Sequence, residues 1–248
     1  MDLPAFASPP FDAAGSLVFC VICLVVVVSF VALHARAGLR WRPFALGLGG
    51  WLGLFLVLAG TGVLSRLAGS MALALYLVAA NGAALVLALT LPGRLVVKAS
   101  SAWMLIAFQL FRGPLELVLH HWYALGALPV QMTYEGQNLD ILTAVAGAMA
   151  LVFLRGWPPS DRYRWWVTLS FNLVGAALLL NVMRVAMQSA PWPMRTFMND
   201  PPVVLPFFVP QTLIVPVCVA GALWGHVVTF RWLWAQRRLH GGLSRTAG

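Results

Sequence analysis

Charged side chains are scarce in this chain of 248 residues, since Asp, Glu, Lys and Arg together make up only 9% of it. A soluble domain carries about 25%. Hydrophobic residues account for 61% of the chain, and the mean hydropathy is +0.86. With so few charged residues, most of the surface of the folded protein cannot face water. The composition therefore excludes an ordinary soluble domain and predicts that the lipid bilayer is the partner of most of the surface.

The chain also lacks the short motifs of common enzyme chemistries. It has no GxSxG nucleophile elbow, no P-loop and no HExxH pair. Its single lysine, Lys98, precedes the fourth apolar segment, which excludes a retinal Schiff base on the seventh. The three cysteines, Cys20, Cys23 and Cys218, lie within apolar segments and are interpreted as small packing residues. We therefore expect no cofactor.

Long apolar runs, in contrast, fill the sequence. Seven segments of about 20 residues are each long enough to cross a hydrocarbon core about 30 Å thick. The alternating pattern of a membrane β-barrel is absent from the sequence. The predicted fold is therefore all-α: a polytopic membrane protein whose residues 1–248 form a single seven-helix bundle. The predicted helices are 16–36, 43–64, 71–92, 100–125, 139–156, 163–188 and 207–232.

Basic residues are distributed unevenly between the two sides of this predicted bundle. One side holds twelve of the sixteen: Arg36, Arg40, Arg42, Arg94, Lys98, Arg155, Arg162, Arg164, Arg231, Arg237, Arg238 and Arg245. The loops of the other side hold Arg66 and Arg195, together with most of the acids: Asp2, Asp12, Glu135, Asp140 and Asp200. The positive-inside rule predicts that the N-terminus is outside and the C-terminus cytoplasmic.

Two further interpretations follow from these charges. The acidic leader is the reverse of the basic start of a signal peptide, so the first segment is predicted to be an uncleaved anchor. The basic loops are short and close to the membrane, which favours contact with anionic lipid. No basic stripe with interleaved aromatic residues is present in the sequence, so we expect no nucleic-acid partner.

The fourth segment carries charges where a membrane-spanning helix is normally apolar, in the run RGPLELVLHH. Arg112, Glu116 and His120 recur every four residues and so share one face. A charge near the bilayer centre costs about 2.5–3.5 kcal/mol on insertion scales, so a protein-lined or hydrated interior must receive it. Two interpretations stay open: a purely structural Arg112–Glu116 ion pair, or a ligand site.

Further polar residues of the sixth segment and the outer loops extend the candidate site. If Arg184 faces the same space as Glu116, the two form a polar cavity that is open to the exterior. Arginine suits carboxylate or phosphate ligands, and histidine can carry protons. The predicted ligand-binding residues are Arg112, Glu116, His120, Glu135, Asn138, Asp140, Asn181 and Arg184. The mouth of the cavity is predicted to consist of Glu135, Asn138, Asp140, Asn199 and Asp200.

Each of these residues also has a simpler interpretation. Arg184 can extend to lipid headgroups, and Asn138 or Asp140 can merely cap the fifth helix. His226 is interpreted as a histidine near the cytoplasmic end of the seventh helix that bonds a neighbour. Adjacent His120 and His121 project about 100° apart on a helix, so they are poorly placed to share one metal ion, and no metal site is predicted.

Three functions follow from this pattern. The leading prediction is the binding or transport of a small polar, anionic solute in an outward-facing cavity. The first alternative is a membrane-embedded enzyme acting on a lipid headgroup or a lipid-linked substrate. In it, Glu116 or His120 is the base, and Arg184 or Arg195 neutralises a phosphate. The second alternative is a sensor or an assembly subunit of a membrane complex.

One resemblance adds to this interpretation. The stretch MTYEGQNLDI at 132–141, after FRGPLELVLHHW, is similar to a stretch in uncharacterised bacterial seven-helix membrane proteins. The later SAPWPMRTFMNDPP and the proline-broken seventh segment that ends at His226 extend the resemblance over residues 108–226. It implies a location in the bacterial inner membrane, and it carries no activity.

Overall fold

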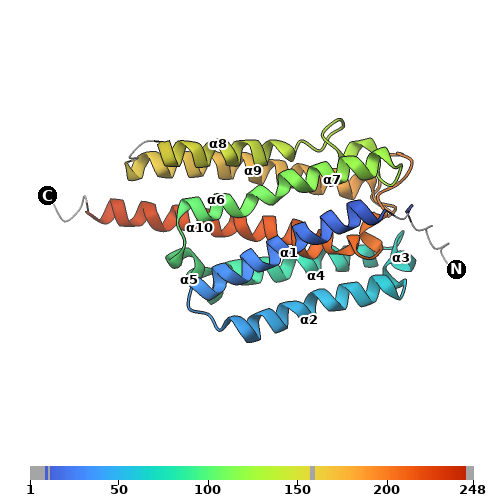
Figure 1. Cartoon of the computed structure of the whole chain (residues 1–248), viewed down its shortest axis with the longest axis horizontal. Helices are drawn as coiled ribbons and strands as arrows, with labels where there is room; N and C mark the ends of the chain where they lie inside the picture. Colours follow the sequence, from blue (N-terminus) through green and yellow to red (C-terminus); the bar gives the residue numbers. More distant parts are fainter. Residues whose placement is uncertain (1–8, 11, 157–159, 244–248) are drawn as a thin grey trace.

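The computed structural model describes residues 9–10, 12–156 and 160–243, so Asp2 and Arg245 lie outside the described residues. Within them, every regular element is helical, as predicted (Figure 1). The α-helices are α1 (Ala13–Arg36), α2 (Trp41–Gly60), α3 (Val63–Leu67), α4 (Ala72–Leu89), α5 (Leu91–Ala99), α6 (Ala102–Phe108), α7 (Arg112–Ala124), α8 (Ile141–Gly156), α9 (Asp161–Ser189) and α10 (Ala220–Leu243). The 3₁₀ turns are η1 (Gln109–Phe111), η2 (Val130–Met132), η3 (Leu205–Phe207) and η4 (Gln211–Leu213), and η5 (Ile214–Val219) is a π-helix.

Five of the described helices are long and apolar enough to cross a membrane. They are α1, α2, α9, the continuous rod Ala102–Ala124 and the rod Gln211–Arg237. The pair Leu73–Leu89 and Leu91–Ala99 becomes a sixth if it counts as one span, although it bends by 59°. Helix α8 has 16 residues and is about 24 Å long, shorter than a hydrocarbon core of about 30 Å. These helices make the chain a multi-pass membrane protein.

The predicted boundary of the third segment needs a correction. The third segment was expected to run over 71–92 and to be followed by a loop, but α4 ends at Leu89 and a second helix begins at Leu91. Arg94 and Lys98 therefore lie in α5 and not in a loop. Pro92 lies in the first turn of α5, where a proline is tolerated, which explains why a new helix starts there.

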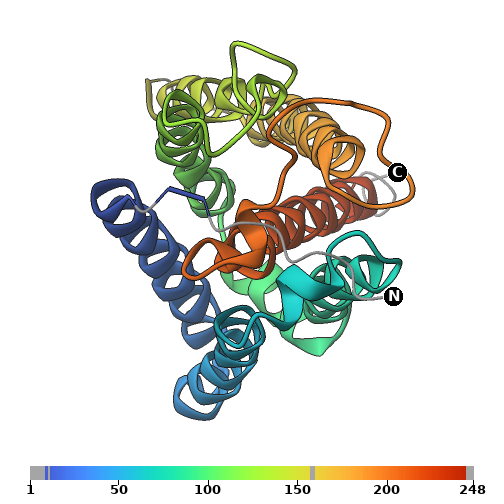
Figure 2. The ribbon, with the colours of Figure 1, turned by 90° about the vertical axis from the view of Figure 1, so that its right-hand side faces the viewer.

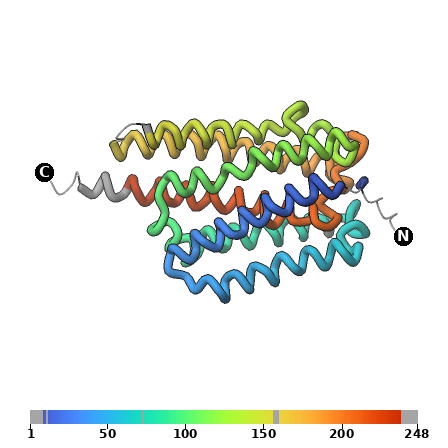
Figure 3. The backbone as a smooth tube through the Cα atoms, in the orientation of Figure 1, coloured from blue at the N-terminus to red at the C-terminus, as the bar shows by residue number. Residues whose placement is uncertain are grey.

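The helical rods run roughly side by side along the long axis of the molecule, with α10 at the centre (Figures 1 and 3). Viewed from the end that carries the N-terminus, α9 and α4 lie on two sides of α10 (Figure 2). Helix α10 packs against α4, α5, α6 and α9, and its Trp224 and Val228 are fully buried. This central position places the polar residues of α10 inside the protein.

The helix type changes near prolines in two rods. Pro114 has no backbone N–H to donate to the preceding turn, and the 3₁₀ turn η1 lies immediately before its helix. The last rod begins after Pro210 with the 3₁₀ turn η4 and continues as η5, which contains Pro216. Such π-helical stretches are frequent at functional sites. Here η5 lines the cavity described below.

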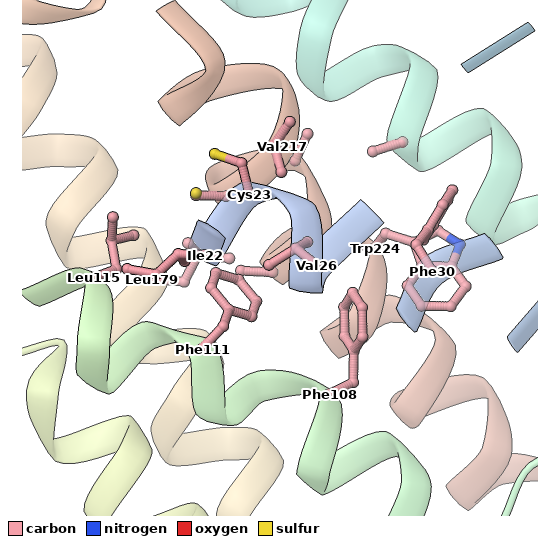
Figure 4. Packing of buried hydrophobic residues seen from close by; sticks show 14 of the residues in the cluster. Ile22, Cys23, Val26, Phe30, Phe108, Phe111, Leu115, Leu179, Val217 and Trp224 are labelled. Atoms are coloured by element: carbon pink, nitrogen blue, oxygen red, sulfur yellow. The ribbon is translucent and has the colours of Figure 1, made fainter. Parts of the chain in front are cut away.

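The largest hydrophobic cluster joins α1, the α6–α7 rod and α10 (Figure 4). The Phe30 ring of α1 meets Trp224 edge-on at a centroid distance of 4.6 Å, and Phe108 of α6 meets the same indole at 5.4 Å. Cys23 and Cys218 are buried in this cluster, as expected of packing residues, whereas Cys20 is exposed. This packing holds the fourth rod against α10, so that Arg112 at the start of α7 is buried.

Candidate functional site

A buried ion pair joins the start of α7 to the start of α8. Arg112 and Asp140 are 1% and 4% exposed. The Arg112 Nε donates to Asp140 Oδ2 at 2.6 Å, and the Nη2 donates to Oδ1, so the contact is bidentate. The predicted partner of Arg112 was Glu116, and that prediction is wrong. Asp140 precedes α8 and presents both carboxylate oxygens to the edge of the guanidinium group.

The third guanidinium nitrogen of Arg112 reaches α9 and α10. Its Nη1 donates to the Gly175 carbonyl at 3.1 Å and to His226 Nε2 at 2.8 Å. Because arginine only donates, His226 Nε2 must accept, and the ring proton lies on Nδ1. That nitrogen donates to Asn172 Oδ1 at 2.8 Å, and Asn172 Nδ2 returns a bond to the His226 carbonyl at 3.2 Å. His226 is therefore a neutral member of the Arg112 network, 2% exposed.

This network requires a close approach of α9 to α10. A Cβ atom added at Gly175 would lie 2.6 Å from His226 Cε1 and 3.1 Å from Thr143 Cγ2. The first of these distances is shorter than the contacts that real Cβ atoms make. Glycine thus allows the helices to meet at the level of Arg112. His226 was expected near the cytoplasmic end of its helix. Its contact with Arg112 places it instead within the polar cluster.

Glu116 has far fewer partners than Arg112, although it is only 1% exposed. Both of its carboxylate oxygens lie 2.9 Å from Asn138 Nδ2, which also donates to the Met132 carbonyl at 3.1 Å. Among the described residues, no other hydrogen-bond donor and no cation within 4 Å reaches Glu116. A carboxylate offers about four acceptor positions. Glu116 is therefore under-satisfied within the protein.

A cavity of about 450 Å³ lies beside this carboxylate. Its walls come from α4, α7, α9 and η5, and from the segments before α8 and after α9. Most of the lining side chains are Leu, Val, Ala, Met or Phe; the polar ones include Glu116, Arg112 and Asp140. Ligand pockets of about 300–1,000 Å³ with mainly apolar walls are typical of small-molecule sites. The cavity is thus of ligand size, and its lining is mainly apolar.

Two of the predicted site residues lie in a separate outer network. The His120 ring stacks on Tyr134 at a centroid distance of 4.6 Å, and its Nε2 lies 3.6 Å from Glu135. The Glu135 side chain is half exposed, and neither residue lines the cavity. His120 and Glu116 are four residues apart, but the Tyr134–Glu135 turn engages the histidine. Glu116 and His120 therefore do not line one pocket, as their predicted joint role requires.

The polar face of α9 also points away from the cavity. Arg184 is exposed and donates to Gln188 at 2.7 Å, Asn181 at 2.9 Å and Gln137 at 3.3 Å. The residues of α9 that line the cavity are Leu179, Val182, Met183, Ala186 and Met187. Since successive residues of a helix are about 100° apart, Asn181 and Arg184 belong to another face. The expectation that Arg184 and Glu116 share one space is wrong.

The remaining predicted residues divide in the same way. Asn138 and Asp140 were expected at the mouth, but both are buried beside Arg112 and Glu116, and Asn138 Oδ1 accepts the Asp140 N–H at 3.1 Å. Asn199 belongs to the loop after α9, where its amide donates to the Pro201 carbonyl at 2.9 Å. Neither Asn199 nor Asp200 lines the cavity.

Sequence analysis missed that Asn172 and His226 belong to the site. The available signal was that each is a polar residue within an apolar span, where such residues tend to face the interior. Their partnership with Arg112 depends on how α9 packs against α10, which no local pattern encodes. Comparisons of the chain with protein-family models, with curated proteins and with solved structures found no match.

Proposed function

We propose that this protein binds, and thereby transports or presents, a small amphipathic molecule in the cavity between α4, α7, α9 and η5. The observation that carries this proposal is a ligand-sized, mainly apolar cavity beside a buried carboxylate with one hydrogen-bond partner. The apolar wall accommodates the body of the ligand. Glu116 contacts its polar group.

The ligand class differs from the anionic solute predicted from the sequence. An anion needs a free cation in the pocket, but the three guanidinium nitrogens of Arg112 are engaged by Asp140, Gly175 and His226. The other candidate cation, Arg184, lies on another face of α9. A negatively charged solute would therefore find no unpaired cation among the described residues that line the cavity.

The geometry favours binding over the two alternatives. An enzyme acting on a lipid headgroup was expected to combine Glu116 or His120 with Arg184 or Arg195. Arg195 instead donates to the carbonyls of Phe197 and Asn199, and His120 and Arg184 belong to other networks. The role of a sensor or assembly subunit does not by itself account for an internal cavity of this size.

Filling the cavity tests the proposal. Ala186 lines the cavity on α9, whereas Ala177 is exposed on the same helix. We expect saturable binding of 1-decanol, a neutral amphipathic probe, to the purified protein in nanodiscs. Ala186→Phe is expected to abolish that binding because the ring occupies the cavity, and Ala177→Phe should leave it unchanged. Isothermal titration measures both, and equal binding by the two variants contradicts the proposal.

The proposal includes a topology: seven crossings of a bacterial inner membrane, an external N-terminus, and α8 as the shortest span. The charge distribution of the loops supports it, as does the packing of α8 along α9. The cavity then lies towards the external side, because the loops before α8 and after α9 line it.

Reporter fusions test this topology. Green fluorescent protein fused to the C-terminus is expected to fluoresce, because that end is cytoplasmic in the proposal, and alkaline phosphatase fused there should be inactive. Alkaline phosphatase fused after Gln137, in the loop before α8, should be active because that loop is external. The opposite pattern of activities would reject the orientation, and an inactive Gln137 fusion with an active fusion after Gly60 would reject the number of crossings.

A further inference from the structure

Two polar groups of the cavity wall, the Glu116 carboxyl group and the Asn81 amide oxygen, have acceptor positions without a hydrogen-bond partner, and we infer that the ligand carries a primary amine in its protonated form. This inference rests on the proposed function and specifies its ligand class. The protonated amine contacts Glu116 and Asn81, while the apolar part of the molecule lies against α4, α9 and η5.

Asn81 supplies the second acceptor. It lies on α4, lines the cavity and is 8% exposed. Its Nδ2 donates to the Leu77 carbonyl at 2.9 Å, one turn earlier in the helix, while its Oδ1 is buried without a hydrogen-bond partner. A buried acceptor without a donor destabilises the folded protein, because it has lost its hydrogen bonds to water. A ligand that donates to Asn81 Oδ1 removes this penalty.

Most donors of the cavity wall are already engaged. The Tyr76 hydroxyl donates to the Thr212 carbonyl at 2.9 Å, and the Trp192 indole N–H donates to the Met187 carbonyl at 2.5 Å. Arg112 donates to Asp140, Gly175 and His226. Arg112 Nη2 and Asn81 Nδ2 each carry a second N–H. The acceptors without a partner, Asn81 Oδ1 and the Glu116 carboxyl group, therefore favour a ligand that donates hydrogen bonds.

The charges of the buried cluster also favour an amine as the ligand. Arg112 neutralises Asp140, and His226 is neutral because its Nε2 accepts from Arg112. Glu116 is thus a carboxyl group without a cation partner in the buried cluster, and a protonated amine supplies that cation. A charge-assisted hydrogen bond to an ammonium group is about twice as strong as a neutral one, whereas a carboxylate or phosphate finds no unpaired cation among the described residues that line the cavity. A primary ammonium group also offers three donors, enough for both Glu116 and Asn81, while a trimethylammonium group offers none.

Four probes with one alkyl chain test the inference. The protein, in nanodiscs of phosphatidylcholine, which has no primary amine, is titrated with decylamine, 1-decanol, decyltrimethylammonium and decanoate. We expect decylamine to bind at least about tenfold more tightly than the other three, since a hydrogen bond to a charged group is the stronger kind. Glu116→Gln should remove at least about tenfold of the decylamine affinity and change that of decanol less than about twofold.

Asn81→Leu provides a second, milder variant in case Glu116→Gln does not fold. It is expected to weaken decylamine selectively, with little effect on decanol. Equal affinities for decylamine and decanol in wild type and in both variants would overturn the amine inference and leave the proposed function intact. If no probe binds saturably, or if Ala186→Phe binds them all as wild type does, the proposed function itself fails.

The amine can come from a free amphipathic molecule or from the headgroup of a membrane lipid. Replacing part of the phosphatidylcholine by phosphatidylethanolamine distinguishes these sources. A headgroup amine that occupies the site competes with decylamine and lowers its apparent affinity in proportion to the lipid content. An affinity for decylamine that does not depend on phosphatidylethanolamine identifies a free amine as the ligand.

Discussion

Arg112→Met is expected to lower the free energy of unfolding by about 3–5 kcal/mol, because it leaves a buried carboxylate without its cation. Asp140 is 4% exposed, and its oxygens accept from Arg112 Nε, Arg112 Nη2 and the Thr143 hydroxyl, the last at 3.2 Å. Once the guanidinium is gone, Asp140 and Glu116 are two carboxylates close to one cavity. Thermal and denaturant unfolding of the purified protein in micelles measures the loss.

A double variant separates the charge from the loss of packing. Arg112→Met with Asp140→Leu removes both charges, so it should be less destabilised than Arg112→Met alone. Arg184→Met is the matched control, since Arg184 is exposed and its hydrogen bonds lie at the surface; its effect is expected to stay within about 0.5 kcal/mol. If the single Arg112 variant is no less stable than the control, the buried ion pair does not contribute to stability.

His226→Leu is expected to destabilise the protein by about 1–3 kcal/mol. Leucine fills much of the volume of the ring, but it leaves Arg112 Nη1 without its acceptor in His226 and Asn172 Oδ1 without its donor. His226→Gln should be milder because its amide offers both an acceptor and a donor. Unfolding measurements on the two variants compare them directly.

The relative stability of the His226→Leu and His226→Gln variants is the informative result. If His226→Gln is as unstable as His226→Leu, the shape of the imidazole next to Gly175 matters more than its hydrogen bonds. If neither variant is destabilised, His226 does not support Arg112, and the neutral tautomer assigned to it loses its structural basis.

The buried network also explains why Glu116 stands out in this protein. Asp140 satisfies the charge of Arg112, while Gly175 and His226 satisfy its remaining donors, so Arg112 acts as a structural cross-link between α7, α8, α9 and α10. Glu116 lies one turn away on α7 and lacks such compensation. A single helix thus carries one charge that holds the bundle together and another that is free to contact a ligand.

Several features were predictable from local sequence. The helix type changes near the prolines of the fourth and last rods, because a missing N–H disturbs the helix wherever the residue lies. The burial of Arg112 and Glu116 follows from the penalty for exposing charge to lipid, whereas Asp140 was expected at the mouth of the cavity. The sequence pointed to the right helix, but for Arg112 it suggested the wrong partner.

The wrong predictions concern which face of a helix points to the cavity and which residues contact each other. Asn181, Arg184 and Gln188 form a coherent polar face, and sequence spacing cannot tell whether that face points to a cavity or to the surface. The structure turns Val182, Met183 and Ala186 inwards instead. His120 likewise shares a face with Glu116 in an ideal helix, yet the loop residues Tyr134 and Glu135 engage it.

Residue by residue, the sequence determined that the chain enters a membrane as apolar helices and which ionisable side chains of those helices must be kept from lipid. These properties follow from transfer free energies and backbone geometry, which belong to single residues or short segments. Only the tertiary structure decided that Arg112 pairs with Asp140 and His226, and that Glu116 and Asn81 line the wall of an apolar cavity. Hydrogen bonds and ion pairs require contact distances of a few ångströms, and the packing of distant helices alone sets those distances.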